Sequence, residues 1–81
     1  MREYTIKQLS EFFEVTDASM RTWLGGYDFT KYIISYKKPL TYGVTKSFCT
    51  DLILRMYKKR ENAKVNRVIN NAKYLRSLLK T

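Results

Sequence analysis

Residues 4–24 read YTIKQLSEFFEVTDASMRTWL and carry the strongest structural signal in the chain. Apolar side chains recur at helical spacing through residues 6–13, which favours a helix with one buried face. Thr5, followed three residues later by Gln8, has the form of a capping box, in which the two side chains satisfy amides at a helix start. This half of the segment therefore predicts a short helix over residues 5–13.

The second half of the segment predicts another short helix. Residues 14–17 interrupt the apolar pattern, Thr16 can cap a new helix, and Asp17 is favourable in its first turn. The helix is expected over residues 17–24, and Gly25-Gly26 would end it. Its apolar side consists of Met20, Trp23 and Leu24. Two short helices joined by a tight turn predict a helix-turn-helix.

A small β-hairpin is expected next, at about residues 30–47. Residues 32–36 are β-branched and aromatic, which favours a strand. Residues 37–40 form a basic turn, because Pro39 does not fit the middle of a strand. Residues 42–46 would return as the second strand.

The C-terminal part is expected to be helical, because residues 50–80 contain neither Pro nor Gly, and Thr50-Asp51 has the form of a helix start. The basic residues 58–60 interrupt its apolar pattern, so one helix and two helices both remain open. An apolar seam at coiled-coil spacing follows, formed by Val65, Val68, Ala72, Leu75 and Leu79. Residues 1–55 are thus expected to form the main domain. Residues 56–81 would be a basic extension, packed on that domain or used for association.

Composition disfavours most enzyme classes. The chain has 81 residues, which suits one domain, and it contains no His and a single Cys. It therefore lacks the commonest general base and the commonest metal ligand, and we expect no catalytic residue, metal or cofactor. Cys49 is expected to be a small buried apolar group.

The charge is strongly positive and unevenly placed. Sixteen Lys and Arg face seven Asp and Glu, a net charge of +9. Residues 1–48 carry 7 basic and 5 acidic side chains, whereas residues 49–81 carry 9 and 2, so the second part alone contributes +7. Such an excess predicts a polyanionic partner or an acidic protein surface. Short apolar runs, the lack of a signal peptide and one unpaired Cys suggest no membrane association and a cytoplasmic, nucleoid-associated location.

Residues 4–24 resemble the opening of MerR-like and excisionase-like DNA-binding domains. The matching positions are Ile6, Leu9, Val15, Thr16, Met20, Arg21 and Trp23. Glu14 departs from the family pattern, which usually has Gly there because the turn favours a left-handed backbone. A looser similarity to the end of the family's wing and the start of its next helix covers Tyr42-Gly43-Val44, Phe48 and Asp51-Leu52.

The resemblance implies a mainly α fold with a small β-hairpin, namely a winged helix-turn-helix with a C-terminal helical extension. Residues 17–24 would be the recognition helix in the major groove, and the basic wing would lie on the DNA backbone. Together with the basic cluster at residues 58–60, the candidate DNA contacts are Thr16, Ala18, Ser19, Arg21, Thr22, Tyr36, Lys37, Lys38, Lys46, Lys58, Lys59 and Arg60.

Other interpretations of these residues stay open. Trp23 fits the core better than a base-stacking role, Arg21 could pair with Asp17 one turn earlier, and residues 58–60 could be a solvated surface. The many tyrosines, Tyr27, Tyr32, Tyr36 and Tyr42 among them, suit strand packing, although one or two could serve a partner.

The leading hypothesis is a non-catalytic protein of excisionase or small-regulator type that binds duplex DNA of a mobile element. The alternative is an adaptor whose seam docks on a larger replication or recombination enzyme and helps it engage single-stranded or primed nucleic acid. A homodimer through the same seam is compatible with either hypothesis. No small-molecule substrate is expected.

Overall fold

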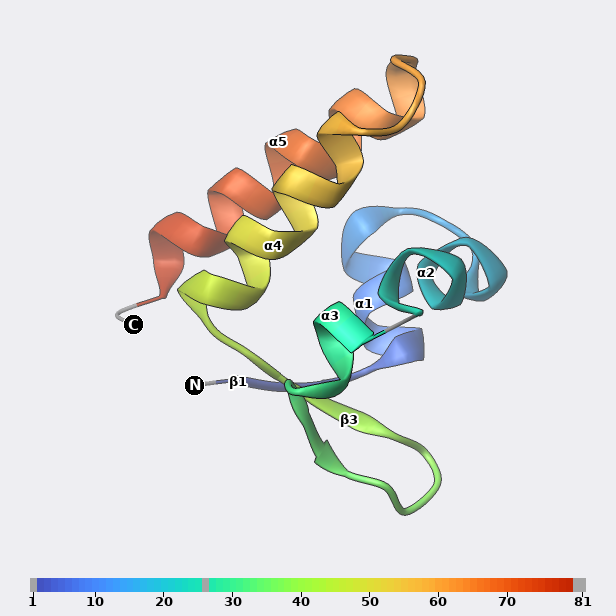
Figure 1. Cartoon of the computed structure of the whole chain (residues 1–81), viewed down its shortest axis with the longest axis vertical. Helices are drawn as coiled ribbons and strands as arrows, with labels where there is room; N and C mark the ends of the chain where they lie inside the picture. The colour runs from blue at the N-terminus through green and yellow to red at the C-terminus, as the bar shows by residue number, and fades with distance from the viewer. Residues whose placement is uncertain (1, 26, 80–81) are drawn as a thin grey trace.

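The computed structural model describes residues 2–25 and 27–79. It is mainly helical with a small three-stranded antiparallel sheet (Figure 1). Gly26, at the predicted end of the second helix, and residues 80–81 lie outside the described residues. The elements are β1 (Arg2–Thr5), α1 (Ile6–Phe13), α2 (Asp17–Leu24), α3 (Tyr27–Thr30), β2 (Ile33–Ser35), β3 (Thr41–Val44), α4 (Lys46–Tyr57) and α5 (Ala63–Leu78).

Helix α1 begins at the predicted capping box. The Thr5 side chain accepts a hydrogen bond from the Gln8 amide at 3.2 Å, and the Gln8 side chain accepts one from the Thr5 amide at 2.9 Å. The helix ends at Glu14, which has the left-handed backbone angles φ 58° and ψ 46°. The next amide, that of Val15, closes the turn by donating to the Ser10 carbonyl at 2.9 Å. The turn therefore forms without glycine.

Helix α2 has the predicted bounds and the predicted cap. Thr16 accepts a hydrogen bond from the Ser19 amide at 3.1 Å. Its buried side is Met20, Trp23 and Leu24. Across the turn, the buried Ser10 hydroxyl lies 2.6 Å from Asp17 Oδ1, so α1 and α2 are linked by a polar contact as well as by packing.

The hairpin forms with shorter strands than predicted, and a third strand joins it. The strand order is β1-β3-β2, and β1 pairs with β3 from Arg2 opposite Val44 to Thr5 opposite Thr41. Strand β1 was not predicted, because four residues carry little periodicity and their partner lies far along the chain. The register of β2 against β3 shifts between Ile33 and Ser35.

The C-terminal region contains two helices. Helix α4 starts at Lys46, so the predicted start at Thr50-Asp51 is wrong. Thr45 is the cap and accepts a hydrogen bond from the Phe48 amide at 3.2 Å. The chain leaves α4 after Tyr57, and Asn62 caps α5 by accepting from the Val65 amide at 2.9 Å. The one-turn helix α3 was also not predicted.

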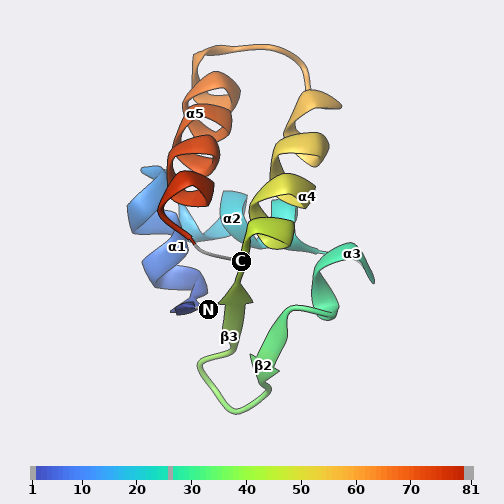
Figure 2. The same ribbon diagram turned by 90° about the vertical axis from the view of Figure 1, so that its left-hand side faces the viewer.

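Helices α4 and α5 run antiparallel, side by side, and α5 also contacts α1 (Figures 1 and 2). All five seam residues, Val65, Val68, Ala72, Leu75 and Leu79, are buried in the single core of the chain. Of the two expectations for residues 56–81, packing on the same domain is what the described part shows. The seam is therefore not an exposed surface for a partner or a second copy, because α4 and α1 already cover it.

The left-handed backbone of Glu14, at the α1–α2 turn, leads to a prediction about stability. A left-handed backbone costs an L-residue with a Cβ roughly 1–2 kcal/mol, and glycine escapes this cost while gaining freedom in the unfolded chain. We expect Glu14→Gly to raise the free energy of unfolding by about 0.5–1 kcal/mol, measured by urea denaturation. Glu14→Ala, which removes the carboxylate but keeps the Cβ, should bring no such gain. If both variants raised the free energy of unfolding equally, the cause would be the loss of the Glu14 charge and not the left-handed backbone, which would contradict the prediction.

Candidate nucleic-acid interface

Helix α2 presents a polar face outward. Its capping residue Thr16 and the helical residues Asp17, Ala18, Arg21 and Thr22 are all exposed. Among the described residues, the Arg21 guanidinium has no hydrogen-bond or ion-pair partner. The structure thus contains no ion pair between Arg21 and Asp17, and the five donors of Arg21 are available to a ligand.

A cleft of about 480 Å³ separates α2 from the connection between β2 and β3. Three cations from three segments line it: Lys7 from the first turn of α1, Arg21 from α2, and Lys38 from the β2–β3 connection. Among the described lining residues, Asp17 is the single carboxylate, and its Oδ1 lies against the Ser10 hydroxyl. The remaining lining residues are Thr5, Ile6, Pro39 and Leu40. Such a concave, cationic surface is suited to an anionic ligand.

The cleft brings together Arg21 and Lys38 of the predicted contacts and adds Lys7. Sequence reasoning missed Lys7, because its only distinguishing signal is its place in the first turn of α1, beside a capping box. Tyr36 and Lys37 lie in the same β2–β3 connection, and the Tyr36 side chain is 71% exposed. The connection therefore carries an exposed aromatic ring next to two lysines.

Ser19 is less available than predicted. Its hydroxyl accepts hydrogen bonds from the Thr16 hydroxyl and from Lys64 Nζ, both at 3.1 Å. Lys64 Nζ also lies 5.7 Å from the centre of the Trp23 ring, which is buried. This lysine reaches α2 from the first turn of α5, 45 residues further along the chain, so no local sequence signal could have found it.

The other predicted contacts lie elsewhere. Lys46 belongs to the first turn of α4 and not to the hairpin. Residues 58–60 lie on the connection between α4 and α5, at the end of the molecule opposite the β2–β3 connection (Figure 2). The structure therefore does not bring Lys58, Lys59 and Arg60 together with the cleft.

Much of the C-terminal positive charge is used inside the domain. Arg55 donates to the Trp23 carbonyl and, at 2.6 Å, to the Gly25 carbonyl, so it binds the C-terminal end of α2. Arg76 donates to the Thr50 hydroxyl at 3.2 Å, and Arg67 lies 3.9 Å from the Glu14 carboxylate. These cations therefore link α4 to the end of α2, α5 to α4, and α5 to the α1–α2 turn.

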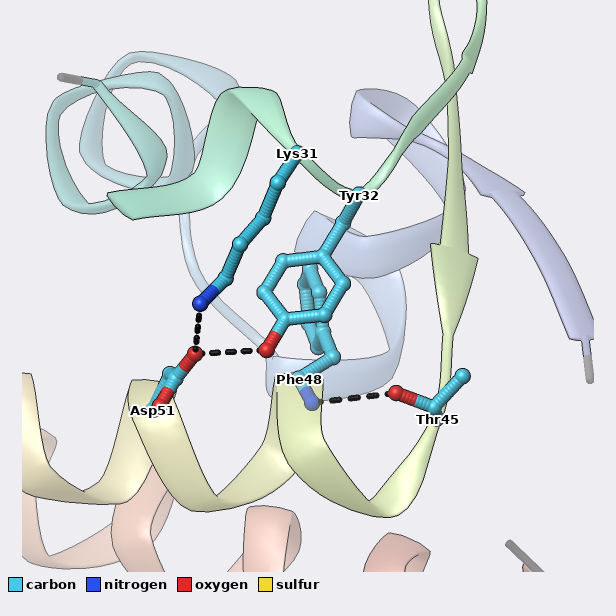
Figure 3. A network of polar contacts seen from close by, with 5 residues as sticks. All are labelled: Lys31, Tyr32, Thr45, Phe48 and Asp51. Atoms are coloured by element: carbon cyan, nitrogen blue, oxygen red, sulfur yellow. Dashed lines mark hydrogen bonds and ion pairs between the residues drawn. The ribbon is translucent and has the colours of Figure 1, made fainter. Parts of the chain in front are cut away.

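A polar and aromatic network fixes the approach to β2 (Figure 3). The Tyr32 hydroxyl donates to Asp51 Oδ2 at 2.5 Å, and Lys31 Nζ lies 3.4 Å from the same oxygen. The Tyr32 ring packs edge-on against Phe48, with ring centres 5.3 Å apart, and Phe48 also contacts the rings of Phe29 and Tyr42. Tyr32 and Tyr42 thus serve packing, as part of the tyrosine set was expected to do.

Cys49 is buried, and its burial raises the pKa of the thiol to about 11. A thiol with so high a pKa stays protonated near neutral pH, which suits the expected role of a small apolar core group. Among the side chains that the structure describes, no group of three or more acidic or Cys residues has metal-binding geometry. None of the helices in this described part is long and apolar enough to cross a membrane.

Comparison with protein-family models, with curated proteins and with solved structures found no significant match.

The hydrogen bond from Tyr32 to Asp51 leads to a prediction about how stability depends on pH. Burial, and then the bond to Asp51, raise the pKa of Tyr32 above the usual value of a tyrosine. Its stabilisation is therefore complete below about pH 10, the unfolded pKa, and is lost as the pH rises further. Tyr32→Phe should lower the free energy of unfolding by about 1–2 kcal/mol near neutral pH.

This deficit of Tyr32→Phe relative to wild type should shrink above about pH 10, as measured by urea denaturation across a pH series. Tyr36→Phe is the matched control, because Tyr36 is exposed, and it should be neutral throughout. A deficit that stays constant with pH would contradict the assignment.

Proposed function

We propose that this chain is a non-catalytic protein that binds duplex DNA through a winged helix-turn-helix. In this proposal α1 and α2 are the helix-turn-helix, α2 is the recognition helix, and the hairpin of β2 and β3 is the wing. The resemblance of residues 4–24 to MerR-like and excisionase-like domains supports the assignment. The left-handed backbone of Glu14 supports it further, since that conformation occurs where the family pattern has glycine.

The observation that carries the proposal is the shared cleft. Lys7, Arg21 and Lys38 line one hollow although they come from three different segments. A DNA backbone that passes between a helix in the major groove and an adjacent wing would meet all three cations. Phosphate contacts of this kind position a protein on DNA and supply a large share of its affinity, whereas base edges in the groove give specificity.

Helix α2 is suited to close approach but offers few groups that could read bases. Ala18 is small, and Thr22 donates its hydroxyl proton to the Ala18 carbonyl at 2.9 Å. Arg21 is the one exposed side chain of α2 with several unused donors, and a guanidinium can bind a guanine edge or a phosphate. The proposal therefore assigns Arg21 the main contact and Lys7, Lys37 and Lys38 the backbone contacts. An excisionase-like architectural factor or a small regulator of a mobile element fits this arrangement.

The test is fluorescence anisotropy with labelled random duplex and single-stranded DNA over a salt series. Wild type should prefer duplex, and its affinity should fall steeply with salt, with a slope near −0.9 for each phosphate contact: about three contacts if Arg21 binds a base and about four if it binds a phosphate. Arg21→Ala and Lys38→Gln should each weaken duplex binding about fivefold or more, because a direct charged contact is worth at least about 1 kcal/mol.

Lys73→Ala is the matched control, since Lys73 is an exposed cation on α5 that does not line the cleft. It should leave duplex affinity nearly unchanged. Equal binding of single-stranded and duplex DNA, with Arg21→Ala and Lys38→Gln silent, would overturn the proposal. Loss of binding in Lys59→Ala alone would move the contact surface to the connection between α4 and α5.

A further inference from the structure

The outward face of α4 carries two large exposed apolar side chains. Leu54 is 55% exposed and Tyr57 is 58% exposed, and neither belongs to the buried core. Helical spacing places them on one stripe with Lys46, Thr50 and Lys58, which we call the α4 face. The opposite side of α4 is buried against the core through residues such as Phe48, Leu52 and Met56.

A hollow of about 370 Å³ lies beside this stripe, and Leu54 forms part of its wall. The other lining residues are Lys31, Asp51, Arg55 and Lys58. Among these described lining residues, the Asp51 carboxylate already binds Tyr32 and Lys31, and Arg55 is bound to backbone carbonyls at the end of α2. Within the described part of the chain, the Lys58 ammonium group has no hydrogen-bond or ion-pair partner.

The other flank of the stripe is also positive. Lys73 Nζ lies 5.9 Å from the centre of the Tyr57 ring, reaching over from α5. The α4 face thus has an apolar centre of Leu54 and Tyr57 with cations on both sides. An apolar centre inside a charged rim is the usual anatomy of a protein-binding surface.

We propose that the α4 face docks an acidic segment of another protein, which packs an apolar side chain against Leu54 and Tyr57. Carboxylates of that segment would pair with Lys58 and Lys73 at the rim, where opposite charges favour association. A second copy of this chain is the wrong partner for the face, because it would set cations against cations on a protein of net charge +9.

This surface is separate from the proposed DNA interface. The hollow and the cleft between α2 and the β2–β3 connection have no described lining residue in common. The docking proposal therefore does not depend on DNA binding, and both surfaces can be occupied together. An adaptor function would act through this exposed face and not through the buried seam at Val68 and Leu75.

The test is an NMR titration of the ¹⁵N-labelled protein with a synthetic peptide of Glu and Asp around a central Leu-Phe pair. A second peptide with Ser-Ser at the centre has the same charge. The Leu-Phe peptide should bind at least about tenfold more tightly, with a Kd below about 1 mM, and should shift the amides of Leu54, Tyr57 and Lys58.

Leu54→Ser should abolish the preference for the Leu-Phe peptide and leave the helical circular dichroism signal unchanged, because Leu54 is outside the core. Leu78→Ser is the matched control: Leu78 is 44% exposed on α5, and its loss should leave the preference intact. Equal affinity for the two peptides, no binding of either one, or an unaffected Leu54→Ser variant would each overturn the proposal. So would shifts of the α4 face that arise with single-stranded DNA but not with the Leu-Phe peptide.

Discussion

The position of the hairpin relative to the helices depends on strand β3, which pairs with β1 on one edge and with β2 on the other. Strand β1 leads directly into α1, because Thr5 is both the last residue of the strand and the cap of the helix. At its C-terminal end, β3 is joined to α4 through the single residue Thr45. Strand β3 therefore links the hairpin to α1 through β1 and to α4 directly, and α2 packs on both of these helices, which sets the two walls of the cleft.

The features that sequence reasoning predicted well are those with local causes. Helices α1 and α2 follow from a capping box, a capping threonine and an apolar face, all within residues 5–24. The start of α4 was missed because Lys46 and Ser47 are polar, so the cap at Thr45 stands before the apolar pattern begins. Strand β1 was missed because its stability comes from pairing with β3, which no local pattern encodes.

The C-terminal seam shows what the spacing of apolar residues can and cannot predict. Its five residues are buried, as apolar residues at that spacing usually are, but spacing does not say which surface covers them. In this fold α4 and α1 cover them. Leu54, which we propose as part of a docking surface, lies in an apolar run, Leu52-Ile53-Leu54, whose other two members are in the core.

The net charge of +9 suggests more cations free for a ligand than the structure provides. Four cations of the C-terminal helices are bound within the protein. Lys64 binds Ser19, and Arg55 binds the end of α2. Arg67 pairs with Glu14, and Arg76 binds Thr50. Among the remaining cations, Lys7, Arg21 and Lys38 line the cleft, and Lys58 and Lys73 flank the α4 face. The cleft beside α2 is concave and is lined by cations from three segments, whereas the α4 face has an apolar centre.

The most direct test of the central claim is an NMR titration of the ¹⁵N-labelled protein with a short duplex at low salt. The account predicts that amides of α2 around Arg21 and amides of residues 36–40 shift together, as one binding event. The amides around Leu54 should stay still. Shifts confined to residues 58–64, or shifts of α2 and of residues 36–40 at different DNA concentrations, would contradict the claim that they form one interface.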